Sequence, residues 1–408
     1  MDTAPNRRTD PGVTLDFPAF AVALGEEASD PVVTHEGRDH RVDELAFSGH
    51  LDRMDEDLAA VAGLDVAVWR YGMPWRLTEP EPGAYDWTLW DRAFAACECH
   101  GLEPVVDLLH FGLPDAYGTR FADPVWVEPF LRYVDAFLAR YPEPRWFTPI
   151  NEPAITANFS AGLGIWNDRV ADPDVHAAAL GNIVRANLEA LARLRADRDG
   201  WWVGAEGFHS PLADEDDPEG QAEGRAVRDR EWAVWDLHLG VEPSPASAEV
   251  VARIDPAVLA RIGELAGTVP DDRIVCGHDA YPVGVSAHGR RAQRPLELAD
   301  RIEAYVATAR AWSDRYRLPF WVSETSNLGL PVDRQTAWLD AMVDALDRLA
   351  AEGHPARGIC WYSRGDQYDW DLALTRPVGK VTEVGLFDAA RVARPAAAAY
   401  RALARARR

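Results

Sequence analysis

The fold is decided by the stretch Arg145-Trp146-Phe147-Thr148-Pro149-Ile150-Asn151-Glu152-Pro153. It begins as an apolar run typical of a buried β-strand, and it ends on Glu152, which stands between an amide and a rigid proline. A second run, Leu318-Pro319-Phe320-Trp321-Val322-Ser323, has the same pattern and is followed by Glu324. Because the ends of parallel strands meet at one edge of a sheet, this pattern predicts two carboxylates in one site. Such a pair is the chemistry of glycosidic bond cleavage.

Strand-like runs alternate with helical patterns along the whole chain, and this alternation predicts a parallel sheet. The expected strands are 17–24, 66–70, 103–109, 145–150, 201–205, 273–277, 319–323 and 358–362. The expected helices are 48–63, 87–100, 124–140, 175–197, 296–312, 334–352 and 395–408. With no break in composition between these units, we expect residues 1–408 to form a single catalytic domain of the α/β class. That domain would be a (β/α)₈ TIM barrel with loop insertions at its C-terminal face. The acidic segment 210–231 is expected to be an excursion over one end of the domain.

Composition limits the partners and the compartment. The 408 residues carry a formal net charge of -24, and a surface this acidic repels phosphates, so neither nucleic acid nor an anionic membrane is an expected partner. No run approaches the ~18 apolar residues of a membrane span. Residues 1–12 are polar, lack the apolar core of a signal peptide, and are expected to be flexible. The chain has four scattered cysteines, which are too few for a disulfide framework, and this predicts a reducing, cytoplasmic location.

The residue types at the expected strand ends fit cleavage with retention of anomeric configuration. That reaction needs an acid to protonate the leaving oxygen and a carboxylate ~5 Å away to attack the anomeric carbon. We expect Glu152 to be the acid and Glu324 the nucleophile. Arg70 and Tyr281 are expected to keep Glu324 ionised and oriented. The amide of Asn151 is expected to bind the sugar 2-hydroxyl.

Trp361 lies near the end of the last expected strand, and its indole would match the apolar C–H face of a sugar ring. Each assignment has a structural alternative. Glu152 could be a salt-bridged structural carboxylate, Arg70 could pair with a structural acid, and Tyr281 could pack at the barrel rim. The two strand-end glutamates together with Arg70 and Asn151 favour a catalytic site.

Five segments resemble glycoside hydrolase family 1, the β-glucosidase and β-galactosidase type, over nearly the whole chain. Residues 151–153 match the core of the family's T-x-N-E-P motif, and residues 109–114 (L-H-F-G-L-P) are similar to Y-H-W-D-L-P. Residues 70–75 resemble R-F-S-I-S-W, and residues 361–370 resemble W-S-x-x-D-N-F-E-W. Gly385-Leu386-Phe387 followed by Arg394-Pro395 is similar to the family's G-L-Y and R-x-P-K.

The resemblance implies that His110 and Asp369 bind sugar hydroxyls and that Trp361 and Trp370 wall the donor subsite. Glu27 occupies the place of the family's N-terminal Q-x-E-G region and is a further sugar-binding candidate. His110 could instead be a hydrogen-bonded core histidine.

The chain also departs from the family pattern. Thr148 lies one position further from Asn151 than the family's threonine does, and Ser323-Glu324-Thr325-Ser326 stands in place of T-E-N-G. The segment 361–370 has one residue more than the family spacing, and Asp369 replaces a glutamate. These departures are expected to affect which sugar is bound more than how the glycosidic bond is cleaved.

No cofactor or metal is expected. Cys97-Glu98-Cys99-His100 has no second pair at zinc-site spacing, and residues two apart do not share a helix face, so buried helix cysteines are expected instead. Asp214-Glu215-Asp216-Asp217 lacks the spaced ligands of a calcium loop and is expected to be a solvated turn.

Three functions remain open from the sequence. The first is a retaining β-glycosidase acting on a small-molecule glycoside or oligosaccharide. The second is a transglycosylase that uses the same two glutamates. The third, from a different class, is a non-catalytic sugar-binding barrel.

Overall fold

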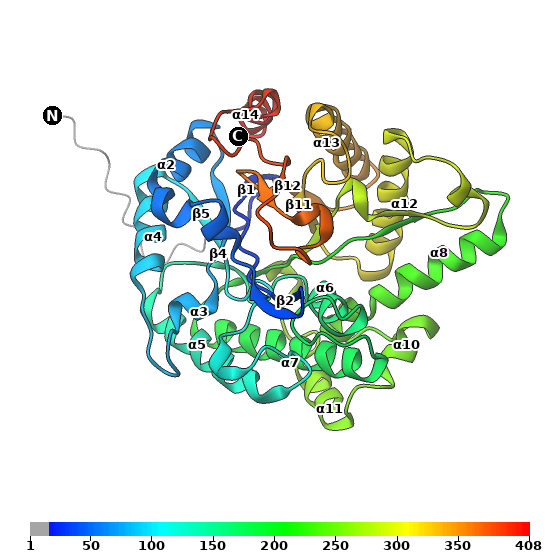
Figure 1. Cartoon of the computed structure of the whole chain (residues 1–408). Coiled ribbons are helices and arrows are strands. Elements are labelled where there is room, and N and C mark those ends of the chain that lie inside the picture. Colours follow the sequence, from blue (N-terminus) through cyan, green and yellow to red (C-terminus); the bar gives the residue numbers. More distant parts are fainter. Residues whose placement is uncertain (1–15) are drawn as a thin grey trace.

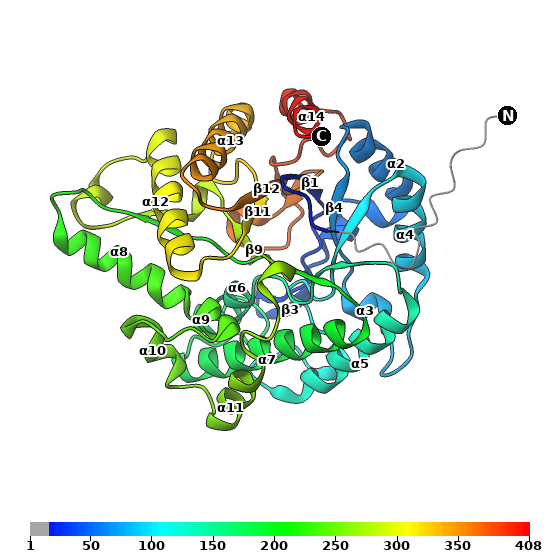
Figure 2. The same cartoon turned by 180° about the vertical axis from the view of Figure 1, so that it is seen from behind.

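The computed structural model describes residues 16–408, in which eight parallel strands close into a barrel surrounded by helices (Figures 1 and 2). Around the barrel, each strand pairs with the next in chain order, and the last returns to the first. The strands are β1 (Ala21–Gly25), β4 (Val68–Gly72), β5 (Glu103–Asp107), β6 (Trp146–Thr148), β7 (Trp201–Val203), β9 (Ile274–Asp279), β11 (Phe320–Thr325) and β12 (Ala356–Trp361). The prediction of a (β/α)₈ barrel is confirmed. The prediction for residues 1–12 lies outside the described residues.

The outer layer consists of helices that pack an apolar face on the strands. In α5 (Val127–Arg140), the buried side chains recur at helical spacing. The other helices are α1 (Glu44–Phe47), α2 (His50–Gly63), α3 (Trp75–Thr78), α4 (Thr88–His100), α6 (Pro153–Ala157), α7 (Pro173–Asp197), α8 (Pro218–Glu231), α9 (Ala233–Leu239), α10 (Pro245–Val251), α11 (Pro256–Leu265), α12 (Leu298–Tyr316), α13 (Gln335–Ala351) and α14 (Pro395–Ala406).

Alternation along the strands divides the core into two parts. Side chains directed into the barrel form one cluster, in which Phe17 packs edge-on against Trp146 and Trp321 with ring centroids 5.2 and 5.5 Å apart. Side chains directed outward join a larger cluster with the helices. Since successive residues of a strand point to opposite faces, the register of each strand decides which residue reaches the barrel mouth.

Short sheets outside the barrel were not anticipated from the sequence. They are the hairpin β2 (Val32–His35) with β3 (Arg38–Arg41), the parallel pair β8 (Ser210–Leu212) with β10 (Val285–Ala287), and β13 (Gln367–Tyr368) with β14 (Val381–Thr382). The acidic segment 210–231 holds β8 and α8, and Figure 1 shows α8 at the periphery of the molecule. Residues 233–265, for which no element was predicted, form α9, α10 and α11.

The acidic segment 214–217 and the cysteines of segment 97–100 lie at the start of α8 and on α4. The Asp217 carboxylate accepts a hydrogen bond from the N–H of Gly220 and caps α8, and Asp216 pairs with Arg290 at 2.5 Å. On α4, Cys97 is buried but Cys99 is exposed, so the expectation that both are buried is wrong for Cys99. The reason is helical geometry, which places residues two apart on different faces. Among residues 16–408, no helix is both long and apolar enough to cross a bilayer.

Candidate active site

A cavity of about 100 Å³ opens at the carboxyl ends of the barrel strands. Both glutamates predicted from the sequence line this cavity, as do His110, Tyr281, Trp370 and Glu27. Its lining also includes residues that the sequence did not single out, namely Phe111, Ile155, Phe159, Gly207, His209, Asp279, Val283, Gly284, Leu328 and Gln367. The barrel therefore brings together residues that are up to 343 positions apart in the sequence, from Glu27 to Trp370.

Glu152 is fixed by the junction between β6 and α6. It has a left-handed backbone, with φ of 39°, and its N–H donates to the carbonyl of Ala205 at 3.1 Å. Pro153 starts α6 directly afterwards, where a missing N–H costs no helix hydrogen bond. A non-glycine residue in this conformation is held by its surroundings, and here it presents the carboxyl group to the cavity.

Glu324 lies near the end of β11, and each of its carboxylate oxygens has a donor. The Tyr281 hydroxyl donates to Oε2 at 2.8 Å, and Nη1 of Arg70 donates to Oε1. Glu324 and Arg70 are 4% and 1% exposed, so water screens this ion pair little. Arg70 and Tyr281 thus contact Glu324 in the way the sequence analysis expected.

Arg70 connects Glu324 to a second group of side chains. Its Nη2 donates to Asp107 at 2.9 Å and also to Oδ1 of Asn151. Because Oδ1 of Asn151 accepts from Arg70, the amide nitrogen of Asn151 donates to Nε2 of His110 at 3.2 Å. Nδ1 of His110 then carries the proton and donates it to Asp107 at 2.8 Å. This network holds Asn151 and His110 in one orientation beside the two glutamates.

A third carboxylate, Asp279, lies between the two glutamates. One carboxylate oxygen from each of Glu152, Asp279 and Glu324 lies within 4.8 Å of the other two. Burial raises the pKa of Glu152 well above its usual range, and the neighbouring charges of Asp279 and Glu324 raise it further. Asp279 escaped the sequence analysis because the expected strand ended at residue 277, whereas β9 continues to Asp279. An oxygen cluster of this size could also hold a cation.

Trp361 is not placed to stack on a sugar, which corrects the prediction from the sequence. It is fully buried in the outer cluster, its Nε1 donates to the carbonyl of Val384 at 2.9 Å, and its ring packs near Tyr400. Cys360 points into the barrel, so Trp361 must point outward.

Tyr362, the next residue, packs against two residues of the site instead. Its ring lies parallel to that of His110, with centroids 6.1 Å apart, and the guanidinium of Arg70 lies 5.5 Å from its centroid. Gly25 leaves room for this ring, since a Cβ there would lie 2.2 Å from Cδ2 of Tyr362. Read from Tyr362, the segment that ends at Trp370 has no extra residue compared with the W-S-x-x-D-N-F-E-W pattern.

Asp369 also departs from its expected role. Its carboxylate accepts hydrogen bonds from the N–H groups of Gly379 at 2.7 Å and Lys380 at 2.9 Å, and it does not line the cavity. Asp369 therefore stabilises the loop that contains Gly379 and Lys380. Its side chain is one carbon shorter than that of glutamate, so its carboxylate stays closer to its own backbone. Glu27 does line the cavity, where its Oε2 accepts from Nε2 of Gln367 at 3.0 Å.

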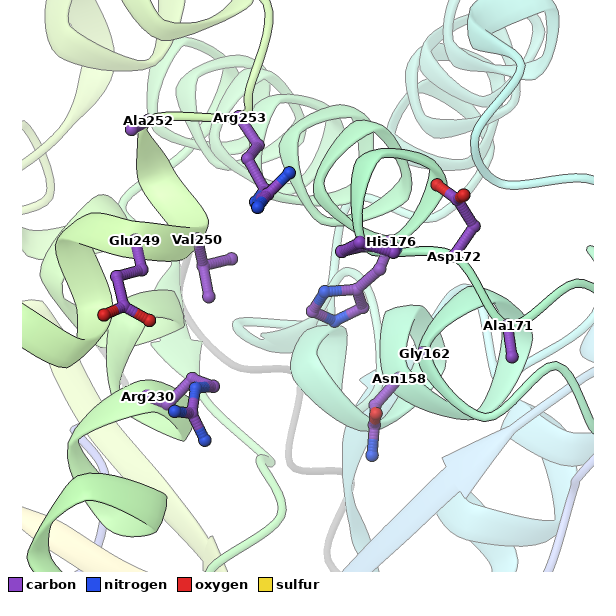
Figure 3. Close-up of a pocket in the computed structure, with 11 residues that line it drawn as sticks. Asn158, Gly162, Ala171, Asp172, His176, Arg230, Glu249, Val250, Ala252 and Arg253 are labelled. Atoms are coloured by element: carbon purple, nitrogen blue, oxygen red, sulfur yellow. The ribbon is translucent and has the colours of Figure 1, made fainter.

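A second and more open cleft, of about 690 Å³, lies between the turn Asn158–Gly162, the start of α7, and α10 (Figure 3). Figure 3 shows the side chains of His176 and Arg230 directed toward its centre. All of its lining residues belong to helices and loops outside the barrel strands. Size alone does not mark a site, and the smaller cavity, with its paired acids, is the candidate active site.

Comparison with known proteins agrees with this geometry. Residues 28–217 match the profile of glycosyl hydrolase family 1. Solved structures of similar fold include a β-glucosidase from Thermotoga maritima in complex with glucoimidazole, with a TM-score of 0.76 at 16% identity, covering 96% of this chain and 99% of that one. The family 1 β-glucosidase from Exiguobacterium antarcticum B7 gives a TM-score of 0.77 at 15% identity, with the same two coverages. No curated protein sequence is significantly similar to the chain. The match to glycosyl hydrolase family 1 covers residues 28–217, somewhat less than half of the chain, and the solved β-glucosidases share the barrel fold of the described residues.

Proposed function

We propose that the protein is a retaining β-glycosidase that hydrolyses a β-linked glycoside through a covalent glycosyl-enzyme intermediate. The observation that carries the proposal is the distance between the two acids, since one carboxylate oxygen of Glu152 lies within 4.8 Å of one carboxylate oxygen of Glu324. Retaining glycosidases place these groups about 5–5.5 Å apart, whereas inverting ones need about 6.5–9.5 Å to admit a water molecule.

The surroundings of the two glutamates assign their roles. Arg70 and Tyr281 both donate to Glu324, and these donors orient the carboxylate for attack on the anomeric carbon. Burial among other acids favours the protonated form of Glu152, which can give its proton to the leaving oxygen. In the second step, Glu152 takes a proton from water as that water displaces the sugar from Glu324.

Side chains that line the cavity, together with Asn151 and Tyr362 directly behind its lining, would hold the sugar. We assign to Asn151 a contact with the 2-hydroxyl, which strengthens as positive charge develops on the ring. His110 and Glu27 would bind other hydroxyls, while Tyr362 and Trp370 would offer apolar ring surfaces to the C–H faces. Support for a β-linked sugar comes from the solved relatives, which are β-glucosidases, one of them in complex with glucoimidazole. The free, buried thiols of Cys97, Cys276 and Cys360 support action in a reducing compartment, the cytoplasm.

The test is the configuration of the first product. A panel of nitrophenyl β-glycosides identifies a substrate, and proton NMR then follows the anomeric signal before mutarotation. The proposal expects the β-anomer to appear first. It also expects Glu324→Ala to be inactive and to form an α-glycosyl azide from an activated aryl β-glycoside in the presence of azide. An α-anomer as the first product would mean inversion and would remove the nucleophilic role of Glu324.

A further inference from the structure

Asp279 is held rigidly beside the two glutamates. It ends β9, where its Cα pairs in register with that of Glu324 on β11. Its N–H donates to the carbonyl of Glu206 at 2.9 Å, and its own carbonyl accepts from the N–H of Phe208 at 3.1 Å. With both backbone groups bonded and 3% of the residue exposed, the carboxyl group has little freedom to turn away.

The two oxygens of Asp279 have different surroundings. Oδ1 accepts a hydrogen bond from the hydroxyl of Ser323. Oδ2 is buried and receives no hydrogen bond from the part of the chain that the structure describes. A buried carboxyl oxygen without a hydrogen-bond partner is costly, and one carboxyl oxygen of Glu152 lies within 4.8 Å of a carboxyl oxygen of Asp279.

The cations and donors of the site are already engaged elsewhere. Arg70 donates to Glu324, Asp107 and Asn151, and the Tyr281 hydroxyl donates to Glu324.

Glu206 is the remaining acid nearby, and it accepts hydrogen bonds from the N–H groups of Ala154 at 3.0 Å and Gly207 at 2.9 Å. Among residues 16–408, no cation or backbone N–H donates a hydrogen bond to the Glu152 carboxyl or to Oδ2 of Asp279. Two neighbouring carboxyls of this kind do not both ionise near neutral pH.

We propose that Asp279 is a positioning residue that shares one proton with Glu152 and so sets the proton affinity of the catalytic acid and base. The proposal deepens the function given above and rests on it. Burial raises the pKa of Asp279 well above its usual range, the charge of Glu324 raises it further, and Arg70 and Ser323 act in the opposite direction.

The shared proton has a consequence in each half of the reaction. In the first half, Glu152 gives the proton to the leaving oxygen while Glu324 forms the bond to the anomeric carbon. Glu152 is then an anion beside Asp279, and this makes it a stronger base toward the incoming water. In the second half, water gives a proton to Glu152 and its oxygen to the sugar, which restores the pair with one proton between them.

The first test is the pH dependence of kcat/KM for Asp279→Asn, because the amide keeps the shape and still accepts from Ser323. Without a carboxyl partner, Glu152 should lose its proton more readily, so the alkaline limb should move to lower pH by about one unit or more. Glu206→Gln is the matched control, and it should move the limb less because two backbone N–H groups already satisfy Glu206. A uniform loss of rate with an unmoved limb, or an equal shift in both variants, would overturn the inference.

The second test needs no turnover. Infrared spectra of the carboxyl C=O stretch, recorded across pH for the wild type, Glu152→Gln, Asp279→Asn and Glu206→Gln, identify which acids are protonated. We expect the Glu152 band to titrate at lower pH in Asp279→Asn than in the wild type. An unchanged Glu152 titration refutes the shared proton whatever the activity. A shifted titration in a protein that cleaves no glycoside would instead keep the shared proton and remove the proposed function.

Discussion

The Tyr281 hydroxyl donates a hydrogen bond of 2.8 Å to Oε2 of Glu324, on the side of the carboxylate opposite to the oxygen that Arg70 contacts. The two donors leave the carboxylate one orientation, in which it faces Glu152 across the cavity. The Tyr281 hydroxyl orients Glu324, so we expect the rate of the reaction to depend on it although it transfers no proton in either step.

Removing that hydroxyl tests the relationship. Tyr281→Phe should lower kcat by roughly 10- to 100-fold, since a hydrogen bond to a charged group contributes about 1.5–3 kcal/mol. Tyr305→Phe is the matched control, because the buried hydroxyl of Tyr305 has no hydrogen-bond partner among the described residues. Steady-state kinetics on an aryl glycoside measure both. Equal losses in the two variants would show that the effect comes from packing.

The acid and base role of Glu152 predicts a characteristic pH profile. The useful form is protonated, so kcat/KM should fall as pH rises through the pKa of Glu152, which burial places well above the ordinary 4.5. Glu152→Ala should lose this alkaline limb on substrates with good leaving groups, which need no acid. Azide should restore its turnover and give a β-glycosyl azide, as product NMR would show. If Glu152→Ala kept the alkaline limb, the fall of kcat/KM at high pH would come from the titration of another group.

The opposite directions of Trp361 and Tyr362 predict opposite phenotypes for leucine variants. Tyr362→Leu should lower kcat/KM about tenfold, because it removes an aromatic face from the site. Trp361→Leu should instead reduce the free energy of unfolding by about 3 kcal/mol while the folded fraction keeps its kcat/KM. Urea unfolding and kinetics on the same samples separate the two effects. A kinetic defect in Trp361→Leu alone would reinstate Trp361 as the stacking residue.

The cluster of three carboxylates predicts the effect of removing metals. Arg70 and Tyr281 already donate hydrogen bonds to Glu324, so this carboxylate does not need a metal ion to hold it in place. We therefore expect dialysis against EDTA to leave kcat unchanged. Activity that falls after dialysis and returns with one divalent cation would assign Glu152, Asp279 and Glu324 to a metal site.

The buried His238 predicts a loss of stability in acid. Its Nδ1 donates to the carbonyl of Val234 at 2.8 Å, and its Nε2 accepts from Asn187 at 2.9 Å, so both nitrogens are satisfied in the neutral form. Burial lowers the pKa of His238 to about 4, whereas in the unfolded chain it is near 6.5.

Below pH 6.5 the unfolded chain therefore binds the proton first, and stability falls by about 3 kcal/mol in total as pH drops to about 4. Urea unfolding of the wild type and His238→Gln at pH 7 and pH 4.5 measures this. The advantage of the wild type should shrink in acid, and a difference that is independent of pH would contradict the prediction.

The sequence by itself predicted the architecture and placed two glutamates at the ends of buried strands. Alternating strand and helix patterns define a barrel, because each buried strand reads as an apolar run and each helix as a 3.6-residue period. Glu152 and Glu324 could be found because each follows such a run directly, and parallel strands carry their ends to the same mouth. Arg70, Asn151, His110 and Tyr281 were found by the same rule.

Only the tertiary structure decided which side chains at those ends face inward. Trp361 was misassigned because a shift of one residue moves a side chain to the other face of a strand, and the apolar runs do not fix strand ends to one residue. Asp279 was missed for the same reason, since β9 extends two residues beyond the predicted end at 277. The distance between Glu152 and Glu324, the loop contacts of Asp369 and the surroundings of Asp279 depend on contacts between distant segments. Local sequence patterns do not specify such contacts, because they arise only when the strands close into a barrel.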